Sequence, residues 1–124
     1  MWDRRAVILE VQDGDSVVAV LDQGFGDTKQ VKVRLHDTWA PESKERGGPE
    51  TQAFAARWMT EALAGGGAWP FVVETVRVRA DTHEVTTFGR YVARVTRVVD
   101  GRCLNEDVAA FVAAAGYGGG IGSR

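Results

Sequence analysis

The sequence predicts a mainly β (α+β) fold in which five strands form one barrel, one helix follows the third strand and a second helix lies at the C-terminal end. Short runs rich in β-branched residues and bounded by glycine or aspartate are typical of strands. Two longer segments carry apolar residues at helical spacing instead. A chain of 124 residues that is 44% hydrophobic has the size and composition of one globular domain. We therefore expect one domain over residues 1–117 and a flexible glycine-rich tail over residues 118–124.

The N-terminal part of the chain predicts three strands joined by tight turns. Residues 6–11 and 16–21 are β-branched runs that flank an Asp-Gly-Asp turn at residues 13–15. A glycine-rich turn follows at residues 22–27. Residues 30–35 then alternate between apolar and charged side chains, so we expect a third strand with one apolar and one charged face.

The middle of the chain predicts a loop and then a helix. Residues 40–48 combine a proline, a charge cluster and two glycines, so we expect no regular element there. Pro49 opens a helix that runs to about Ala64, and the glycines at residues 65–67 end it. Its apolar stripe, expected to pack on the barrel, consists of Phe54, Trp58 and Ala62.

The C-terminal part predicts two more strands, residues 71–80 and 89–99, joined by a polar turn at residues 81–87. Five strands with a helix after the third fit the order of an OB-fold barrel. We expect Asn105 to cap the last helix and Gly116 to end it. The inward positions of this helix are expected to be Val108, Phe111, Val112 and Ala115.

Charge and cysteine content narrow the possible functions. The net charge of -2 gives no general attraction for nucleic acid, so any such binding must be local. Cys103 is the only cysteine, which excludes an internal disulfide and a cysteine-based zinc site, and we expect it in the core. The chain start lacks an apolar leader, and no apolar run reaches the length of a membrane span. We therefore expect a cytoplasmic monomer without membrane contact.

Five short motifs follow one another along the chain. They are Asp-Gly-Asp-Ser at 13–16, Val-Arg-Leu at 33–35, Ala-Pro-Glu at 40–42, Phe-Gly-Arg at 88–90 and Asn-Glu at 105–106. In this order they resemble the staphylococcal nuclease (thermonuclease) family, whose pattern runs Asp-Gly-Asp-Thr, Val-Arg-Leu, Asp-Ala/Thr-Pro-Glu, Tyr/Phe-Gly-Arg and Asn-Glu. Each motif alone is weak, but five in the right order with compatible spacing are specific. The resemblance spans roughly residues 5–117 and implies hydrolysis of DNA or RNA.

The resemblance also implies roles for individual residues. Glu42 matches the family residue that orients and deprotonates the attacking water, and Arg34 and Arg90 match two residues that bind the phosphate. Phe88 stands where the staphylococcal enzyme has a tyrosine and can stack on a base. Asp15 matches one of two aspartate ligands of a calcium ion. The implied cofactor is therefore Ca²⁺, and the implied partner is DNA or RNA, with single strands favoured.

The second metal ligand departs from the family pattern. Its position is occupied by Trp39, whose indole offers one N–H donor and no oxygen. Asp37 would face the same way if the segment were extended, and an alternative alignment makes Asp37 and Thr38 the Asp-Thr pair of the family. We therefore take Asp15 and Asp37 as candidate metal ligands. Asp13 is expected to be a turn residue that bonds its own backbone.

Three functions remain open from the sequence. The first is a calcium-dependent nuclease that acts on DNA, RNA or both. The second is a nuclease-like binding module that keeps Arg34 and Arg90 for phosphates but has lost the metal. The third is a protein-interaction or structural domain, because OB barrels host many unrelated functions. Arg34 and Glu42 could also form an ordinary surface ion pair.

Overall fold

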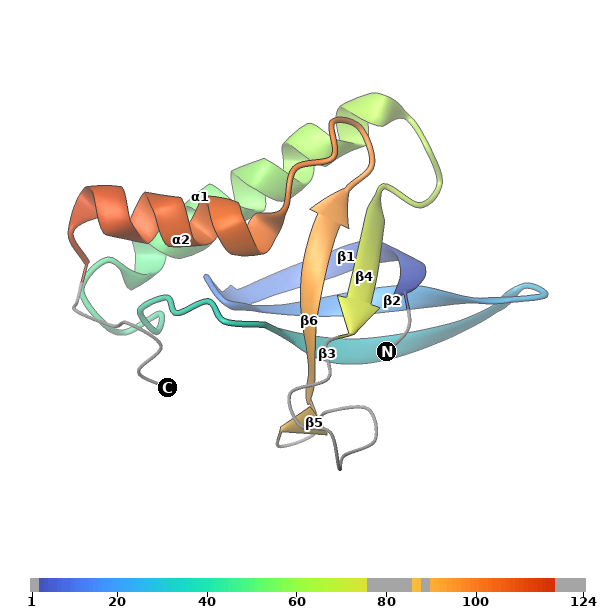
Figure 1. The fold of residues 1–124 in the computed structure, drawn as a ribbon, viewed down its shortest axis with the longest axis horizontal. Helices are drawn as coiled ribbons and strands as arrows, with labels where there is room; N and C mark the ends of the chain where they lie inside the picture. The colour runs from blue at the N-terminus through green and yellow to red at the C-terminus, as the bar shows by residue number, and fades with distance from the viewer. Residues whose placement is uncertain (1–2, 76–85, 88–89, 118–124) are drawn as a thin grey trace.

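The computed structural model describes residues 3–75, 86–87 and 90–117. Six strands and two helices follow one another along this part of the chain, with a short 3₁₀ turn, Leu63–Gly65, after the first helix (Figure 1). In chain order they are β1 (Asp3–Asp13), β2 (Ser16–Gly24), β3 (Asp27–Leu35), α1 (Gly48–Ala62), β4 (Phe71–Thr75), β5 (Thr86–Thr87), β6 (Arg90–Arg97) and α2 (Leu104–Ala115).

Five of the strands form a closed barrel. β1 pairs antiparallel with β2 and β4, β2 pairs with β3, and β4 pairs with β6. A parallel pairing between β3 and β6 closes the barrel, while the two-residue β5 is attached to β6. The predicted mainly β fold is confirmed: it is an OB-like barrel with α1 after β3 and α2 at the C-terminal end.

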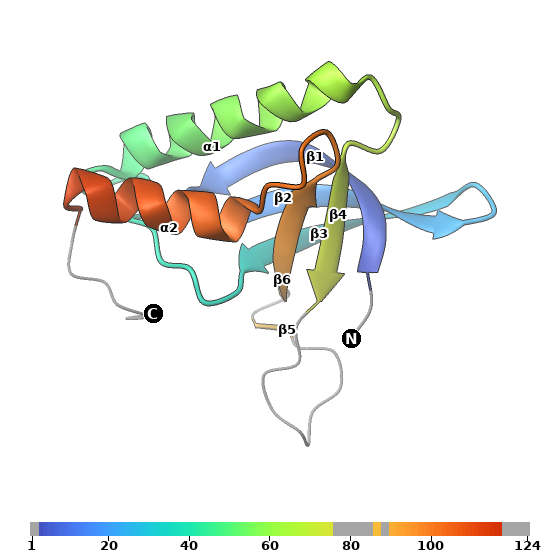
Figure 2. The same ribbon diagram turned by 45° about the horizontal axis from the view of Figure 1, so that its top comes forward.

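The apolar faces of the strands and the two helices enclose one core. Both helices lie on the same side of the barrel and contact each other (Figures 1 and 2). Trp58 and Ala62 of α1 and Val108 of α2 are buried in this core, as expected, and so is Cys103. The largest fully buried strand residues are Phe71, Leu21, Leu35, Val17, Val33, Val73 and Val95. No helix in the described part of the chain is long and apolar enough to cross a membrane.

Several strands and one helix begin or end at other residues than predicted. β2 and β3 continue beyond the barrel as a two-stranded ribbon up to the pair Gly24 and Asp27, although the residues there are polar and exposed (Figure 1). β6 ends at Arg97 because the chain turns there, and the Gly101 N–H donates to its carbonyl oxygen at 2.9 Å. α1 begins at Gly48 and ends at Ala62 rather than Ala64. Residues 76–80 and 89 of the predicted strands lie outside the described residues.

Two expectations for α2 were also wrong. The helix begins after Cys103, and no side chain caps it. Asn105 is 4% exposed and bonds across the molecule instead, because the fold brings its amide against backbone groups of β6 and of the chain after β3. Ala115 is exposed, because the core contacts of α2 are made mainly by its first three turns. Gly116 ends the helix in a left-handed conformation, as predicted.

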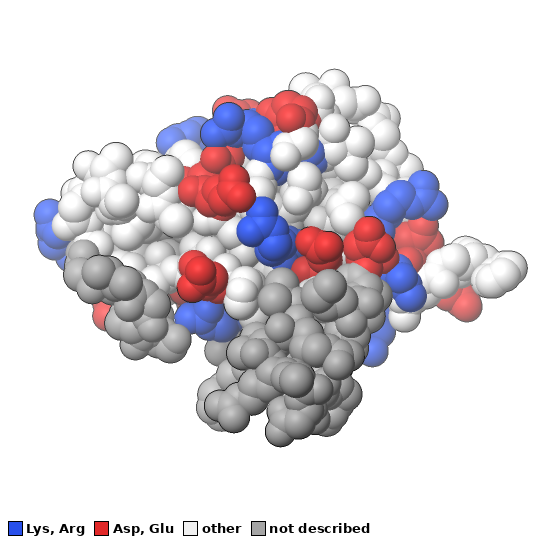
Figure 3. Space-filling model, viewed as in Figure 1, with Lys and Arg blue, Asp and Glu red and all other residues white. Residues whose placement is uncertain are grey.

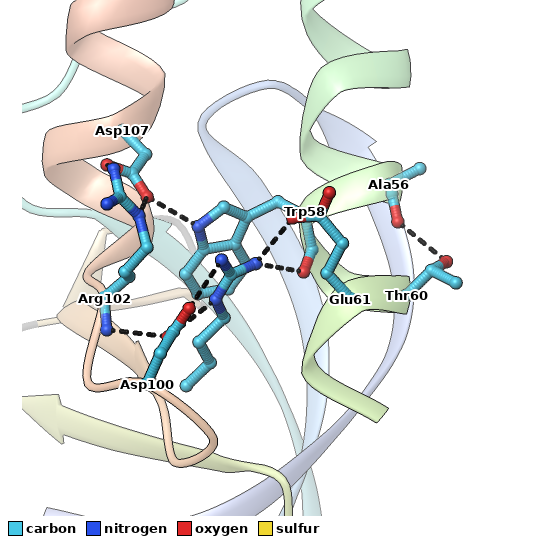
Figure 4. A network of polar contacts seen from close by, with 8 residues as sticks. Ala56, Trp58, Thr60, Glu61, Asp100, Arg102 and Asp107 are labelled. Atoms are coloured by element: carbon cyan, nitrogen blue, oxygen red, sulfur yellow. Dashed lines mark hydrogen bonds and ion pairs between the residues drawn. The ribbon is translucent and has the colours of Figure 1, made fainter. Parts of the chain in front are cut away.

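A polar network joins α1, α2 and the turn after β6 (Figure 4). Arg97 is 6% exposed, lies 4.8 Å over the Trp58 ring and donates to the Trp58 carbonyl oxygen at 2.9 Å. It also donates to both oxygens of Asp100, at 2.9 and 2.8 Å. The Trp58 indole N–H and the Arg102 guanidinium both donate to Asp107. The network therefore fixes how the two helices pack on the barrel.

The Arg97 and Asp100 pair predicts an acid-sensitive contribution to stability. The two hydrogen bonds from Arg97 lower the pKa of the Asp100 carboxyl from its ordinary value. The contribution is therefore complete above the unfolded-state pKa of about 4 and is lost as pH falls below it, because the unfolded chain binds the proton first. We expect urea unfolding at a series of pH values to show that the free energy of unfolding falls less at acid pH in Asp100→Asn than in the parent. An unchanged pH dependence would contradict this role of the pair.

Candidate functional site

Asp15 lies in the two-residue turn that joins β1 to β2. It is 4% exposed, and its backbone carbonyl accepts from the Leu35 N–H at 2.9 Å. Its carboxylate accepts from the Ala40 N–H at 3.2 Å and from the Ser16 hydroxyl at 3.4 Å. The neighbouring Gly14 allows this close approach, since a Cβ atom there would come 2.9 Å from the Ala40 side chain. Asp15 thus ties the start of β2 to the end of β3 and to the loop that follows.

Arg34 lies near the end of β3. Its backbone pairs in register with Ser16 of β2 and Val92 of β6. The side chain is half-buried, and Nη1 donates to the carbonyl oxygens of Leu35 and Thr38 at 3.2 and 3.5 Å. Nε and Nη2 of Arg34 donate to none of the described residues. No Asp or Glu among the described residues forms an ion pair with Arg34. The alternative of an Arg34 and Glu42 ion pair is therefore not realised.

Glu42 stands on an exposed loop with a fixed backbone. Its N–H donates to the Glu45 carboxylate at 2.7 Å, and its carbonyl accepts from the Glu45 N–H at 2.8 Å. Asp13 accepts from the Ser43 N–H at 3.1 Å. The expectation that Asp13 bonds its own turn was therefore wrong: the loop folds back onto the β1–β2 turn, and its Ser43 N–H is the donor. The Glu42 side chain is exposed.

Asp37 does not lie in an extended segment. Its φ angle is +54°, in the left-handed region, because residues 36 and 37 form a turn at the end of β3. The Thr38 hydroxyl donates to the His36 carbonyl at 3.0 Å, and the Asn105 amide donates to the same oxygen at 3.0 Å. The premise of an extended segment, in which Asp37 faces the same way as Trp39, is therefore wrong, and the Asp37 side chain is exposed.

The remaining predicted residues lie on or beside β6. Arg90 begins this strand, and its backbone pairs with Lys32 of β3. Arg90 is thus two residues from Val92, the register partner of Arg34. Phe88 lies outside the described residues.

The segments that carry three of the predicted site residues, Asp15, Arg34 and Glu42, lie next to one another. The β1–β2 turn with Asp15, the end of β3 with Arg34 and the loop with Glu42 are joined by direct hydrogen bonds. We call these segments, residues 13–16, 33–35 and 38–43, the turn–loop region. Lys32, to which the sequence analysis assigns no role, is exposed on the same face of β3 as Arg34. Its even spacing from Arg34 in an alternating strand was the available signal.

The described residues on the face shown in Figure 3 do not form one basic surface. On the face shown in Figure 3, acidic and basic side chains are interspersed over the described residues. Two hollows lined by described residues have volumes of about 370 and 260 Å³, between α1 and α2 and between β1 and α1. Neither hollow contains a predicted site residue. Attraction for an anion at the turn–loop region must therefore come from local cations such as Arg34.

The donor set does not make up a calcium site. Calcium takes six to eight oxygen ligands, with carboxylates prominent among them. Within the described ranges no group of three or more His, Cys, Asp or Glu residues can hold a metal ion. Asp15 already accepts two hydrogen bonds, and Trp39 packs half-buried against the hydrophobic core and brings no oxygen. These residues do not fit the calcium ion that the resemblance implies.

Calcium binding can be tested by substituting Trp39. We expect calcium to leave the Tm of the parent unchanged and to raise the Tm of Trp39→Asp, since a ligand that binds only the folded state stabilises it. Position 39 directly precedes Ala40, whose N–H bonds the Asp15 carboxylate, so the substitution adds a carboxylate to the segment that contacts Asp15. Trp39→Asn, without the charge, is the matched control. A calcium-dependent rise in the Tm of the parent would show that its own donors suffice to bind calcium. No rise in the Tm of Trp39→Asp would refute the alignment that places residue 39 at the second metal ligand.

Neither a comparison with protein-family models nor one with curated protein sequences finds a match for this chain. The function is therefore argued from the residues of the turn–loop region themselves.

Proposed function

We propose that this chain is a nuclease that binds single-stranded nucleic acid through its phosphodiester backbone and hydrolyses it. The observation that carries the proposal is the Arg34 guanidinium, which is half-buried and has no carboxylate partner among the described residues. Arginine presents a planar fork of donors that matches two phosphate oxygens. Among the described residues, none accepts a hydrogen bond from Nε or Nη2 of Arg34.

The loop beside Arg34 supplies the group for hydrolysis. Glu42 is exposed, and its backbone is four residues beyond Thr38, whose carbonyl accepts from Arg34. In the proposed reaction the Glu42 carboxylate accepts a proton from water, the water oxygen bonds to phosphorus and the bond to the leaving oxygen breaks. That leaving oxygen takes a proton from solvent. Arg34, with Arg90 as the second proposed phosphate ligand, offsets the negative charge that grows on the phosphate oxygens.

A second candidate function is binding without hydrolysis. The incomplete calcium donor set and the half-buried Trp39 favour it, since nuclease-type hydrolysis in the resembled family relies on a metal ligand at that position. In this case Arg34 would hold the same phosphate, and Glu42 would have no chemical role.

Cleavage and binding of labelled single-stranded DNA and RNA separate the two candidates. Assays with calcium, with magnesium and with a chelator are run on the parent, Arg34→Ala and Arg57→Ala, the last being an exposed arginine on α1. We expect Arg34→Ala to weaken binding and to lower the salt dependence of binding by about one released counterion, whereas Arg57→Ala binds like the parent. Cutting by the parent supports hydrolysis, and binding without cutting supports the second candidate. Equal binding by all three proteins would overturn both.

A further inference from the structure

Two adjacent glycines fasten the loop that carries Glu42. A Cβ atom at Gly48 would overlap the backbone carbonyl of Glu42, so the first residue of α1 packs directly against the proposed base. Gly47 has a φ of +83°, and a Cβ atom there would lie 2.5 Å from ring atoms of Tyr117. The Gly47 carbonyl accepts from both the N–H and the hydroxyl of Thr51. The loop is thus held between α1 on one side and the Tyr117 ring on the other.

Tyr117 is itself held in place by the end of α2. Gly116 ends the helix with a φ of +71°, and the Tyr117 N–H donates to the Val112 carbonyl at 3.2 Å. This is the hydrogen-bond pattern of a glycine-terminated helix, which fixes the direction of the next residue. The Tyr117 ring packs 6.1 Å from Phe111, which in turn stacks 4.5 Å from Phe54 of α1. An aromatic row therefore links α1, α2 and Tyr117.

The same ring also holds a charged residue of the loop. The Arg46 guanidinium lies 5.5 Å from the centre of the Tyr117 ring, within the range of a cation–π contact. Gly47 and Arg46 thus cover Tyr117 from the loop side. The Tyr117 ring, and not its hydroxyl, makes the contacts with Gly47 and Arg46.

We propose that Tyr117 is a positioning residue that holds the 42–47 loop closed and so places the Glu42 carboxylate for its reaction. This inference rests on the proposed function, because it assigns to a residue outside the five motifs a role in hydrolysis. A displacement of about 1 Å of a reacting group can cost about 100-fold in rate, so a loop that opens removes catalysis without removing the phosphate contact of Arg34.

The test compares Tyr117→Ala with Tyr117→Phe in the full chain. Trypsin cuts after Lys44 and Arg46, which both lie in the loop, so the rate of cutting there reports loop opening independently of nuclease activity. We expect Tyr117→Ala to raise this rate by about tenfold or more, at a temperature where the variant is folded, because local opening costs less without the ring contacts. Trypsin cutting at Arg57 on α1 serves as the internal control, and Tyr117→Phe should behave like the parent.

Cleavage kinetics complete the test. Tyr117→Ala should lower kcat about 10- to 100-fold with KM unchanged, and Tyr117→Phe should restore it. Where Tyr117→Ala does not fold, Gly47→Ala disturbs the same contact from the loop side and should give the same result. Unchanged trypsin cutting at Lys44 and Arg46, or unchanged kcat in an opened loop, overturns the role of Tyr117. If the parent itself cleaves no nucleic acid, the proposed function fails, whereas the trypsin result still decides whether Tyr117 holds the loop.

Discussion

Glu42→Gln should lower the rate of nucleic-acid cleavage by about 10²- to 10⁴-fold, the usual contribution of a general base. The amide keeps the size of the side chain but cannot accept a proton from water. The bonds from Glu42 to Glu45 use the N–H and the carbonyl of Glu42, which the substitution does not change. Initial rates of cleavage of a labelled single strand, under the conditions in which the parent cuts, give the measurement.

Two comparisons make this prediction specific. Glu50→Gln replaces another exposed glutamate, in the first turn of α1, and should leave the cleavage rate unchanged. The affinity of Glu42→Gln for uncut substrate should equal that of the parent, because the phosphate contact is assigned to Arg34. Cleavage by Glu42→Gln at the parental rate would remove Glu42 from the mechanism.

Asn105→Ala should lower the free energy of unfolding by about 3 kcal/mol, because it removes three hydrogen bonds to backbone groups, each worth about 1 kcal/mol. The Asn105 amide donates to the carbonyls of His36 and Ala93 at 3.0 and 3.1 Å, and its oxygen accepts from the Val95 N–H at 3.1 Å. The side chain therefore joins α2 to β6 and to the turn after β3. Urea unfolding followed by tryptophan fluorescence measures the loss.

Gln52→Ala is the matched control for Asn105. Its amide makes one hydrogen bond, to the Val11 carbonyl at 2.9 Å, and it is only half-buried. We expect it to cost about 1 kcal/mol, the net worth of a typical hydrogen bond. Equal losses in the two variants would show that Asn105 is no more than an ordinary polar contact.

The strands could be predicted from the sequence wherever one face is buried. Alternation over residues 30–35 correctly placed Val31, Val33 and Leu35 in the core, since a side-chain period of two follows directly from strand geometry. The start of β3 at Asp27 could not be predicted in this way. Residues 27–30 are all exposed and paired with β2 through backbone bonds, which leave no pattern in side-chain polarity.

The long-range contacts of the candidate site could not be predicted from local pattern. Asn105 has the residue type and position of a helix cap, but its amide is used by groups 10 to 69 residues away. Asp13 likewise reaches Ser43 rather than its own turn. In both cases the fold brings a backbone group from another segment close, and nothing in the neighbouring residues indicates it. The closeness of Arg34 to the Glu42 loop could be predicted from their separation in the sequence, whereas that of Asp15 was predicted only through the family resemblance.

Titration of a single-stranded oligonucleotide into ¹⁵N-labelled protein tests most directly whether nucleic acid binds where Arg34 and Glu42 lie. The bound phosphodiester should shift the amide resonances of the turn–loop region, residues 13–16, 33–35 and 38–43, and Arg34→Ala should abolish these shifts. Shifts confined to the hollow between α1 and α2, around Phe54 and Phe111, or no shifts at all, would contradict a phosphodiester site at this end of the barrel.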